Sequence, residues 1–307
     1  MIIVDNGSGD DLAGVVSAHL PQATTISMGS NAGYTAAVNR GSEVASGELL
    51  VILNPDARPE PGFGKAIRGP LEERPGWDAW MALVAYEEDG RKLINSFGNP
   101  LHFTGLCWAG GHGRPVSEAG GPREVPTLSG ACMAIPLMTW REIGGFSDRF
   151  FLYQEDTDLS VRLRNVNATI GLWPEAVVDH DYDFGRRAQK FLWLERNRLA
   201  MIVRSYPAGL LLLLLPALIA TELAMLVIAF REGWVREKLR ANLQVLTWMP
   251  RLLKERRGIQ ATRALATARF AGFLTPDLDS EFLPEAVKRG PIRFALRAYW
   301  RLVKRVL

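Results

Sequence analysis

Cysteine is scarce in this sequence, and no segment of the chain repeats. The 307 residues include two cysteines, Cys107 and Cys132, whose positions fit neither a disulfide framework nor a metal-ligand spacing. We expect both thiols to be free and buried, which suits a reducing compartment. No unit of twenty or more residues recurs, which excludes a solenoid or a propeller. A signal-peptide pattern is also lacking, because residues 2–4 already read as a buried strand.

Acidic residues are scarce in the last quarter of the chain. Residues 231–307 contain 17 Lys and Arg but only 7 Asp and Glu, whereas the first 230 residues contain 19 and 26. An acidic body with a basic tail predicts that the tail meets an anionic partner, either phospholipid or nucleic acid. The tail lacks a helix-turn-helix or zinc pattern, so we expect an anionic membrane surface and no nucleic acid.

Short apolar runs alternate with helical patterns through the first two hundred residues. Strands are expected near residues 2–4, 24–28, 48–53, 77–86, 127–136 and 170–178, with helices near 12–20, 34–45, 138–143, 156–165 and 191–206. Strands that alternate with helices favour parallel pairing. We therefore predict an α/β fold with a mostly parallel, Rossmann-like sheet that has helices on both faces.

A long apolar segment, residues 208–230, separates this body from the basic tail. Its 23 residues exceed the about 20 that span a bilayer, but basic residues lie on both sides and Pro216 and Glu222 interrupt it. We expect a re-entrant or interfacial segment with both flanks in the cytoplasm; a single span ranks second and a buried core helix third. In the last helix, Arg293, Arg297 and Arg301 share one face, which suits lipid headgroups.

Acidic residues follow several of the predicted strands. Asp5, Asp56 and Asp179 come at strand ends, with His180 beside the last, and the run 155–158 opens a helix with three carboxylates. In open α/β sheets, ligands bind beyond the carboxyl ends of the strands. Converging carboxylates favour a cation between them, and Mg²⁺ or Mn²⁺ would complete its coordination with phosphate oxygens and water. This pattern predicts a site for a diphosphate.

Several short motifs occur in a particular order. They are Asp5-Asn6-Gly7-Ser8, Asn31-x-Gly33, Asn39-x-Gly41, Leu53-Asn54-Pro55-Asp56-Ala57, Ser129-Gly130-Ala131, Gly144-Gly145-Phe146 and Glu155-Asp156-x-Asp158-Leu159-x-x-Arg162. Over roughly residues 1–200 this ordered set resembles the family 2 glycosyltransferases of the GT-A fold, especially their rhamnosyltransferase-like members. Each motif alone is weak, whereas the ordered set is fairly specific.

The resemblance implies a role for each matching residue. Asp156 would be the catalytic base, and Ser129, Gly130 and Glu155 would lie on the acceptor side. Asp56 and His180 would hold Mg²⁺ or Mn²⁺ on the donor diphosphate. The donor nucleotide would contact Asp5, Asn6, Asn31, Gly33 and Asn39.

The resemblance also implies the reaction. An inverting enzyme would move a sugar such as rhamnose from a nucleotide diphosphate to a cell-envelope or polyprenyl-linked glycan. The catalytic domain would cover residues 1–200, and residues 201–307 would attach it to the cytoplasmic face of the cell membrane. The acceptor hydroxyl would attack in one displacement while Asp156 takes its proton.

The sequence departs from the family pattern at three places. Asn54 stands where many members have the first Asp of the metal motif, and Asp181-Tyr182-Asp183-Phe184-Gly185 replaces the usual glycine-rich stretch after His180. The chain also opens at what would be the second strand of the family. We expect a truncated gene start, because a sheet without that strand would expose an apolar edge.

Structural roles compete with each of these assignments. Asp5 and Asp56 are also typical turn residues, and Asp156 is a typical helix N-cap. Asp158 and Arg162 are predicted to form a helix-surface ion pair. The rival function is a non-catalytic relative that binds nucleotide or glycan, or that scaffolds a membrane complex.

Overall fold

The computed structural model describes residues 1–74, 76–180, 188–280 and 288–307. The segment 181–185 that follows His180 therefore lies outside the described residues. The described strands are β1 (Ile2–Asp5), β2 (Thr24–Ser27), β3 (Leu49–Leu53), β4 (Ala57–Pro59), β5 (Ala79–Glu88), β6 (Arg91–Ser96), β7 (Leu101–His102), β8 (Arg123–Glu124), β9 (Cys132–Pro136), β10 (Ile170–His180) and β11 (Leu274–Thr275).

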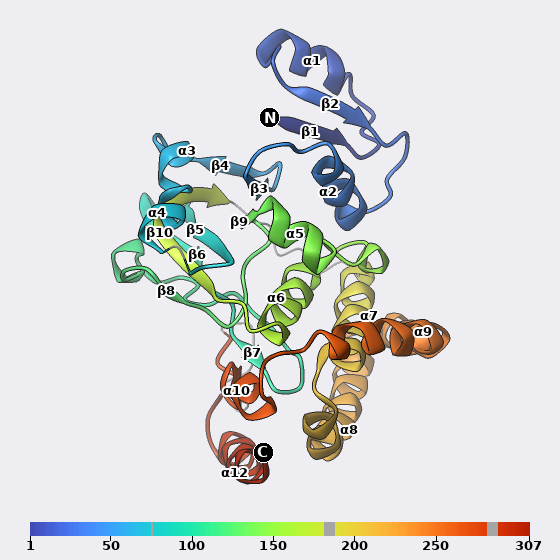
Figure 1. Ribbon diagram of the computed structural model, residues 1–307. Helices are drawn as coiled ribbons and strands as arrows, with labels where there is room; N and C mark the ends of the chain where they lie inside the picture. The colour runs from blue at the N-terminus through green and yellow to red at the C-terminus, as the bar shows by residue number, and fades with distance from the viewer. Residues whose placement is uncertain (75, 181–187, 281–287) are drawn as a thin grey trace.

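The described helices lie between these strands and after them. They are α1 (Leu12–His19), α2 (Tyr34–Glu43), α3 (Phe63–Ala66), α4 (Gly69–Glu73), α5 (Leu137–Ile143), α6 (Glu155–Asn165), α7 (Ala188–Ser205), α8 (Ala208–Arg231), α9 (Val235–Ala261), α10 (Thr267–Gly272) and α12 (Pro291–Val306). Short 3₁₀ turns occur at Val116–Glu118 and Asp148–Phe150. Figure 1 shows α8, α10 and α12 at the opposite end of the molecule from β1 and β2.

The central sheet is mixed, so the expectation of a mostly parallel sheet is wrong. Its strand order is β3-β9-β5-β10-β4, with β6 paired to β5 and β8 paired to β10. Among the described strands of this sheet, β5 and β10 form the one parallel pair. One reason lies in the turn Asp89-Gly90, where both residues have positive φ. Such a two-residue turn folds β5 and β6 into an antiparallel hairpin.

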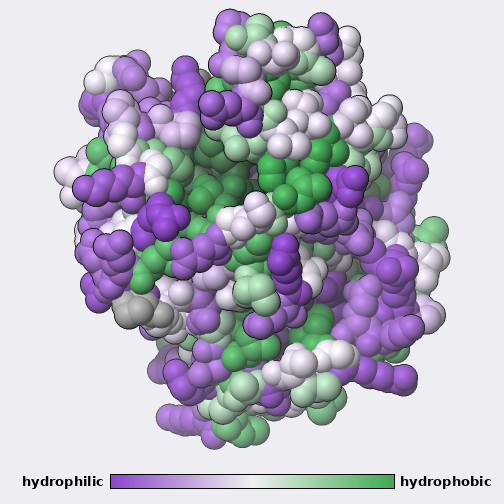
Figure 2. Space-filling view, turned by 45° about the horizontal axis from the view of Figure 1, so that its top comes forward, coloured by the Kyte–Doolittle hydropathy of each residue, from purple (hydrophilic) through white to green (hydrophobic). Residues whose placement is uncertain are grey.

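The first two strands form a separate parallel sheet. β1 pairs with β2 from Ile2 opposite Thr24 to Asp5 opposite Ser27, and neither strand pairs with the seven-stranded sheet within the described residues. The apolar residues of β1 stay partly exposed. Figure 2 shows apolar side chains gathered in a recess across the middle of one face, with hydrophilic side chains around them.

Two hydrophobic clusters fill the interior, and α6 belongs to both. Leu159 and Leu163 pack with the central sheet. Val161 packs with the second cluster, which residues of α7, α8, α9 and α12 build. Ten of the eleven residues of α6 are buried, so this helix has almost no face toward solvent.

Candidate active site

A hollow of about 400 Å³ lies where β3, β9 and β10 meet the N-terminal end of α6. Because β3 and β9 are antiparallel, the segment that leaves β3 lies beside the segment that enters β9. The hollow is lined by six of the predicted site residues, namely Asp56, Ser129, Gly130, Glu155, Asp156 and His180. The strand order thus brings together residues more than a hundred positions apart.

Asp156 is held firmly in one wall of the hollow. Its Oδ2 accepts the backbone N–H of Gly130 at 2.8 Å, and its Oδ1 accepts that of Thr157 at 2.6 Å. Burial raises the pKa of Asp156 above its ordinary value, although these hydrogen bonds oppose the rise. A carboxylate offers about four acceptor sites, so Asp156 can still accept a further proton donor from the hollow.

Glu155 is the second carboxyl group of this wall. Its side chain is buried, and its Oε2 has no hydrogen-bond partner among the described residues. Burial raises the pKa of Glu155 well above its usual range, and the negative charge of Asp156 raises it further. Perturbed carboxyl groups of this kind gather at functional sites.

The backbone that leads into these carboxyls is strained. Phe151, Tyr153 and Gln154 all have positive φ, which side chains other than glycine rarely adopt. The amide of Asn197 in α7 donates to the carbonyls of Leu152 at 2.9 Å and Tyr153 at 2.7 Å. Such strain persists only where the surroundings enforce it, and it gathers at functional sites.

Asp56 and His180 form a second group of polar side chains that lines the hollow. Their Oδ1 and Nε2 atoms lie 3.0 Å apart, and Asn54 places a buried Oδ1 nearby without a hydrogen-bond partner among the described residues. No group of three His, Cys, Asp or Glu side chains that could hold a metal ion occurs in the described part of the chain. Two oxygen ligands and one imidazole nitrogen nevertheless fit a divalent ion such as Mn²⁺, whose remaining positions diphosphate and water would fill.

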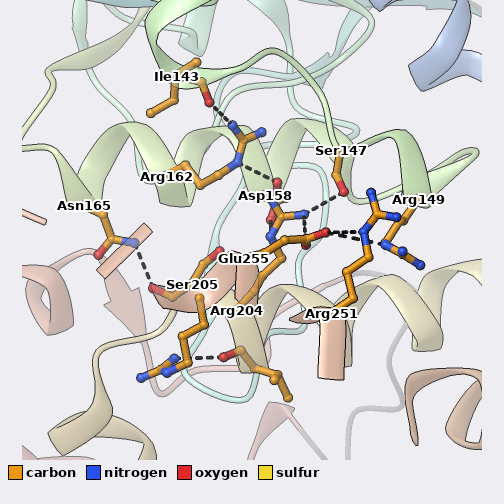
Figure 3. A network of polar contacts seen from close by, with 12 residues as sticks. Ile143, Ser147, Arg149, Asp158, Arg162, Asn165, Arg204, Ser205, Arg251 and Glu255 are labelled. Carbon is orange, nitrogen blue, oxygen red and sulfur yellow. Dashed lines mark hydrogen bonds and ion pairs between the residues drawn. The ribbon is translucent and has the colours of Figure 1, made fainter. Parts of the chain in front are cut away.

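A buried ionic network fixes α6 to the neighbouring helices (Figure 3). Asp158 accepts Nε of Arg162 at 2.8 Å and lies 3.6 Å from Nε of Arg204 in α7. Arg204 in turn lies 3.4 Å from Glu255 in α9. The expected pair between Asp158 and Arg162 is present, but it is buried, so its expected position on the helix surface is wrong.

The predicted nucleotide residues do not line this hollow. Asp5 accepts the backbone N–H of Ser8 at 2.8 Å, and these bonds from Ser8 lower the pKa of Asp5. Asn6 donates to Asn31 at 3.2 Å, and Asn31 accepts the N–H of Gly33 at 3.0 Å. These contacts show that the side chains of this group shape the turns around β1 and α2.

Gly33 and Asn39 join α2 to the segment before α6. Gly33 has φ +95°, and a Cβ there would lie 2.6 Å from the ring of Phe151. Asn39 donates to the carbonyl of Phe146 at 3.0 Å and to Asp148 at 2.6 Å. Both residues therefore position the strained loop without entering the hollow.

Several further residues of the hollow carry no motif in the sequence. Tyr34 donates to the carbonyl of Gly130 at 3.1 Å, and burial raises its pKa well above the ordinary value. Lys190 at the start of α7 is buried, and its Nζ lies 5.2 Å from the ring centre of Tyr153. Trp108 also lines the hollow. Asp179, in contrast, pairs with Lys92 at 2.9 Å.

The chain is similar in sequence to known glycosyltransferases. The sequence profile of "Glycosyl transferase family 2" matches residues 1–107. The N-acetylglucosaminyl-diphospho-decaprenol L-rhamnosyltransferases of two Mycobacterium tuberculosis strains are 27% identical over 202 residues, which is 59% of this chain and 66% of theirs. The chain thus aligns with slightly less than two thirds of the length of these relatives.

One solved structure supports the fold. The crystal structure of GalNAc-T7 with UDP, GalNAc and Mn²⁺ has a TM-score of 0.52 at 13% identity, covering 66% of this chain and 41% of that one. S. aureus TarS has a TM-score of 0.46 at 13% identity over 99% of this chain and 80% of its own. The chain is thus similar to glycosyltransferase family 2 over residues 1–107, has a GT-A-like fold, and is distantly related to the mycobacterial rhamnosyltransferases.

Proposed function

We propose that this chain transfers a sugar from a nucleotide-diphosphate donor to an acceptor hydroxyl with inversion at the anomeric carbon. The observation that carries the proposal is the single hollow between the pair Asp56–His180 and the pair Glu155–Asp156. A donor diphosphate on the first pair and an acceptor hydroxyl on the second would face each other across it.

In this proposal each wall has a separate task. Asp156, oriented by the N–H groups of Gly130 and Thr157, accepts the proton of the attacking hydroxyl. Asp56, His180 and the Oδ1 of Asn54 would hold Mn²⁺ or Mg²⁺, and the bound ion would supply positive charge to the leaving diphosphate. Lys190 adds a buried positive charge at the same hollow. No covalent intermediate with the protein is needed.

The finer assignment follows the relatives. The mycobacterial relatives are named for transferring L-rhamnose to N-acetylglucosaminyl-diphospho-decaprenol. We propose rhamnose as the sugar, a polyprenyl-diphosphate-linked or other cell-envelope glycan as the acceptor, and the cytoplasmic face of the cell membrane as the place of reaction. The 27% identity and the basic tail support this assignment.

The test is transfer of labelled rhamnose from a nucleotide-diphosphate donor to N-acetylglucosaminyl-diphospho-lipid by the full chain. We expect product with Mn²⁺ or Mg²⁺, loss of product with EDTA, and a rate about 10²–10⁴-fold lower for Asp156→Asn, because that change removes the proton acceptor. Full activity in EDTA together with full activity of Asp156→Asn would contradict the mechanism. Met138→Gln, an exposed change in α5, is the control.

The rival function is a relative that binds a nucleotide without turnover. The observation that favours it is the separate β1–β2 sheet, because the predicted nucleotide residues around it lie outside the hollow. Tight nucleotide binding in calorimetry, with neither transfer nor hydrolysis for any donor sugar tested, would support that alternative.

A further inference from the structure

Helix α8 exposes one continuous apolar face along its whole length. Leu212, Leu215, Ile219, Leu223, Val227 and Phe230 recur every three or four residues, and each is between 53% and 75% exposed. No charged residue interrupts this face before Arg231. Among the described helices, α8 is the one long and apolar enough to cross a membrane. An exposed apolar patch of this size marks an interaction surface.

The opposite face of α8 is attached to the body of the protein. Leu210 and Leu214 near its start and Ala229 near its end are fully buried. In the middle, Glu222 accepts Nζ of Lys238 in α9 at 2.6 Å and also binds Arg198 of α7. These attachments hold the helix along its length, not only at one end.

The two basic partners of Glu222 are themselves deeply buried. Lys238 is 0% exposed and Arg198 is 1% exposed, and both also bind Glu195 of α7. Taking Glu222 away would leave these cations with less compensating charge, which is costly in a buried site. The ionic cluster therefore keeps α8 against α7 and α9.

Helix α9 cannot accompany α8 into hydrocarbon. It begins at Val235, with three residues between it and the end of α8, and it carries charged residues in its first two turns and again from Arg251 to Arg257. Its exposed side includes Leu239, Leu243 and Leu246 interleaved with arginines such as Arg236 and Arg240. This mixture of leucine and arginine suits the boundary between headgroups and acyl chains.

Helix α12 adds a second basic and apolar surface next to α8. The hydroxyl of Tyr299 donates to the carbonyl of Leu213, which fixes α12 against α8. Phe294 and Leu302 are exposed on α12. An open hollow of about 440 Å³ beside it is lined by Arg297, Arg301 and Lys304, with Trp300 and residues 274–276. Such a basic hollow can take a phosphate headgroup.

We propose that α8 lies in the plane of an anionic bilayer, with its exposed apolar face among the acyl chains, and does not cross it. The basic residues of α9 and α12 meet the headgroups on the same side. A bilayer with anionic lipid is the occupant that matches both the apolar stripe and the positive charge. A second copy would instead place the same basic helices against each other, which like charges oppose.

Vesicle flotation of the full chain, without any donor sugar, tests the occupant. We expect binding to vesicles with 30% phosphatidylglycerol to exceed binding to pure phosphatidylcholine by more than tenfold. The double change Ile219→Asp, Leu223→Asp affects exposed side chains, so the fold stays intact while vesicle binding falls at least tenfold. Met138→Asp, which puts the same charge on an exposed residue of α5, should bind like the unaltered chain.

Nitroxide labels on cysteines placed at Leu212, Ile219 and Val227 test the orientation, with the unaltered chain giving the background from Cys107 and Cys132. A helix in the plane gives similar shallow depths at all three positions. A label depth that is greatest at Ile219 would overturn the proposal, because it would mean that α8 crosses the bilayer. Failure of the chain to bind any vesicle would also overturn it. So would a dimer of the unaltered chain that the double variant does not form, because a second copy would then cover α8. Because these experiments need no catalysis, their outcome is independent of the proposed transferase activity.

Discussion

The adjacent carboxyl groups of Glu155 and Asp156 have different surroundings. Asp156 accepts two backbone N–H groups, whereas the Oε2 of Glu155 is buried without a partner in the described part of the chain. Burial raises the pKa of Glu155, and the charge of Asp156 adds to the rise. The folded protein therefore binds the Glu155 proton more tightly than the unfolded chain does.

This difference predicts how Glu155→Gln changes stability with pH. Because the folded pKa is raised, the stability that the protonated Glu155 provides is complete below the unfolded pKa of about 4.3 and is lost as pH rises toward the folded pKa. At pH 8 we expect Glu155→Gln to unfold with a free energy about 1–2 kcal/mol higher than the unaltered chain, from urea titrations. At pH 4 the two proteins should match, and an equal gain at both pH values would refute this explanation.

Sequence reasoning identified some residues of the site and missed others for a physical reason. Asp56 lies just after β3 and Asp156 lies in the first turn of α6, so their motifs could be read locally. Lys190 and Trp108 line the same hollow, but only the packing of α7 and of the loop before β8 brings them there. Asp5 ends its strand as predicted, yet its strand belongs to the other sheet.

At the scale of elements, the loop from Phe151 to Gln154 depends on a contact with helix α7, which comes later in the chain. Asn197 in α7 is fully buried, and its amide donates to the carbonyls of Phe150, Leu152 and Tyr153. No local sequence signal predicts three left-handed residues in this loop, because the conformation comes from the tertiary contact. The prediction of parallel strands was wrong for a related reason. β9 pairs antiparallel with β3, and the alternation of strands and helices along the sequence does not reveal this direction.

Removing the Asn197 amide should loosen this loop. We expect Asn197→Ala to lower the free energy of unfolding by about 2–4 kcal/mol, since several buried carbonyls lose their donor. Asn165→Ala is the matched control: Asn165 is equally buried, but its amide makes one bond, to the carbonyl of Ser205 at 2.8 Å. Urea titration measures both. If Asn165→Ala lowers the free energy of unfolding as much as Asn197→Ala does, burial of the asparagine and not its contact with the loop determines the loss.

At the scale of the whole molecule, buried charges tie the C-terminal helices to the site. Asp158 of α6, Arg204 of α7 and Glu255 of α9 follow one another across three helices. The proposed boundary at residue 200 lies inside α7, within this connected region. The division into residues 1–200 and 201–307 therefore remains a prediction about function and not about separate folding.

The network predicts a large cost for one small change. Asp158→Asn keeps the shape of the side chain but leaves Arg162 and Arg204 without their shared negative charge, so we expect a loss of about 3 kcal/mol in the free energy of unfolding. Glu43→Gln breaks the exposed pair with Arg40 and should cost less than 1 kcal/mol. Chemical denaturation of both variants checks this. Equal losses in the free energy of unfolding for the two variants would mean that the buried network stabilises the fold no more than the exposed pair does.

The two-sided burial of α6 also limits how its sequence can vary. A surface helix accepts many substitutions on its solvent side, but ten of the eleven residues here are buried. A replacement at almost any position must satisfy a neighbour that is already fixed. Over evolutionary time, drift in this stretch is confined to few alternatives, while the outward faces of α8 and α12 are free to diverge as long as their polarity persists.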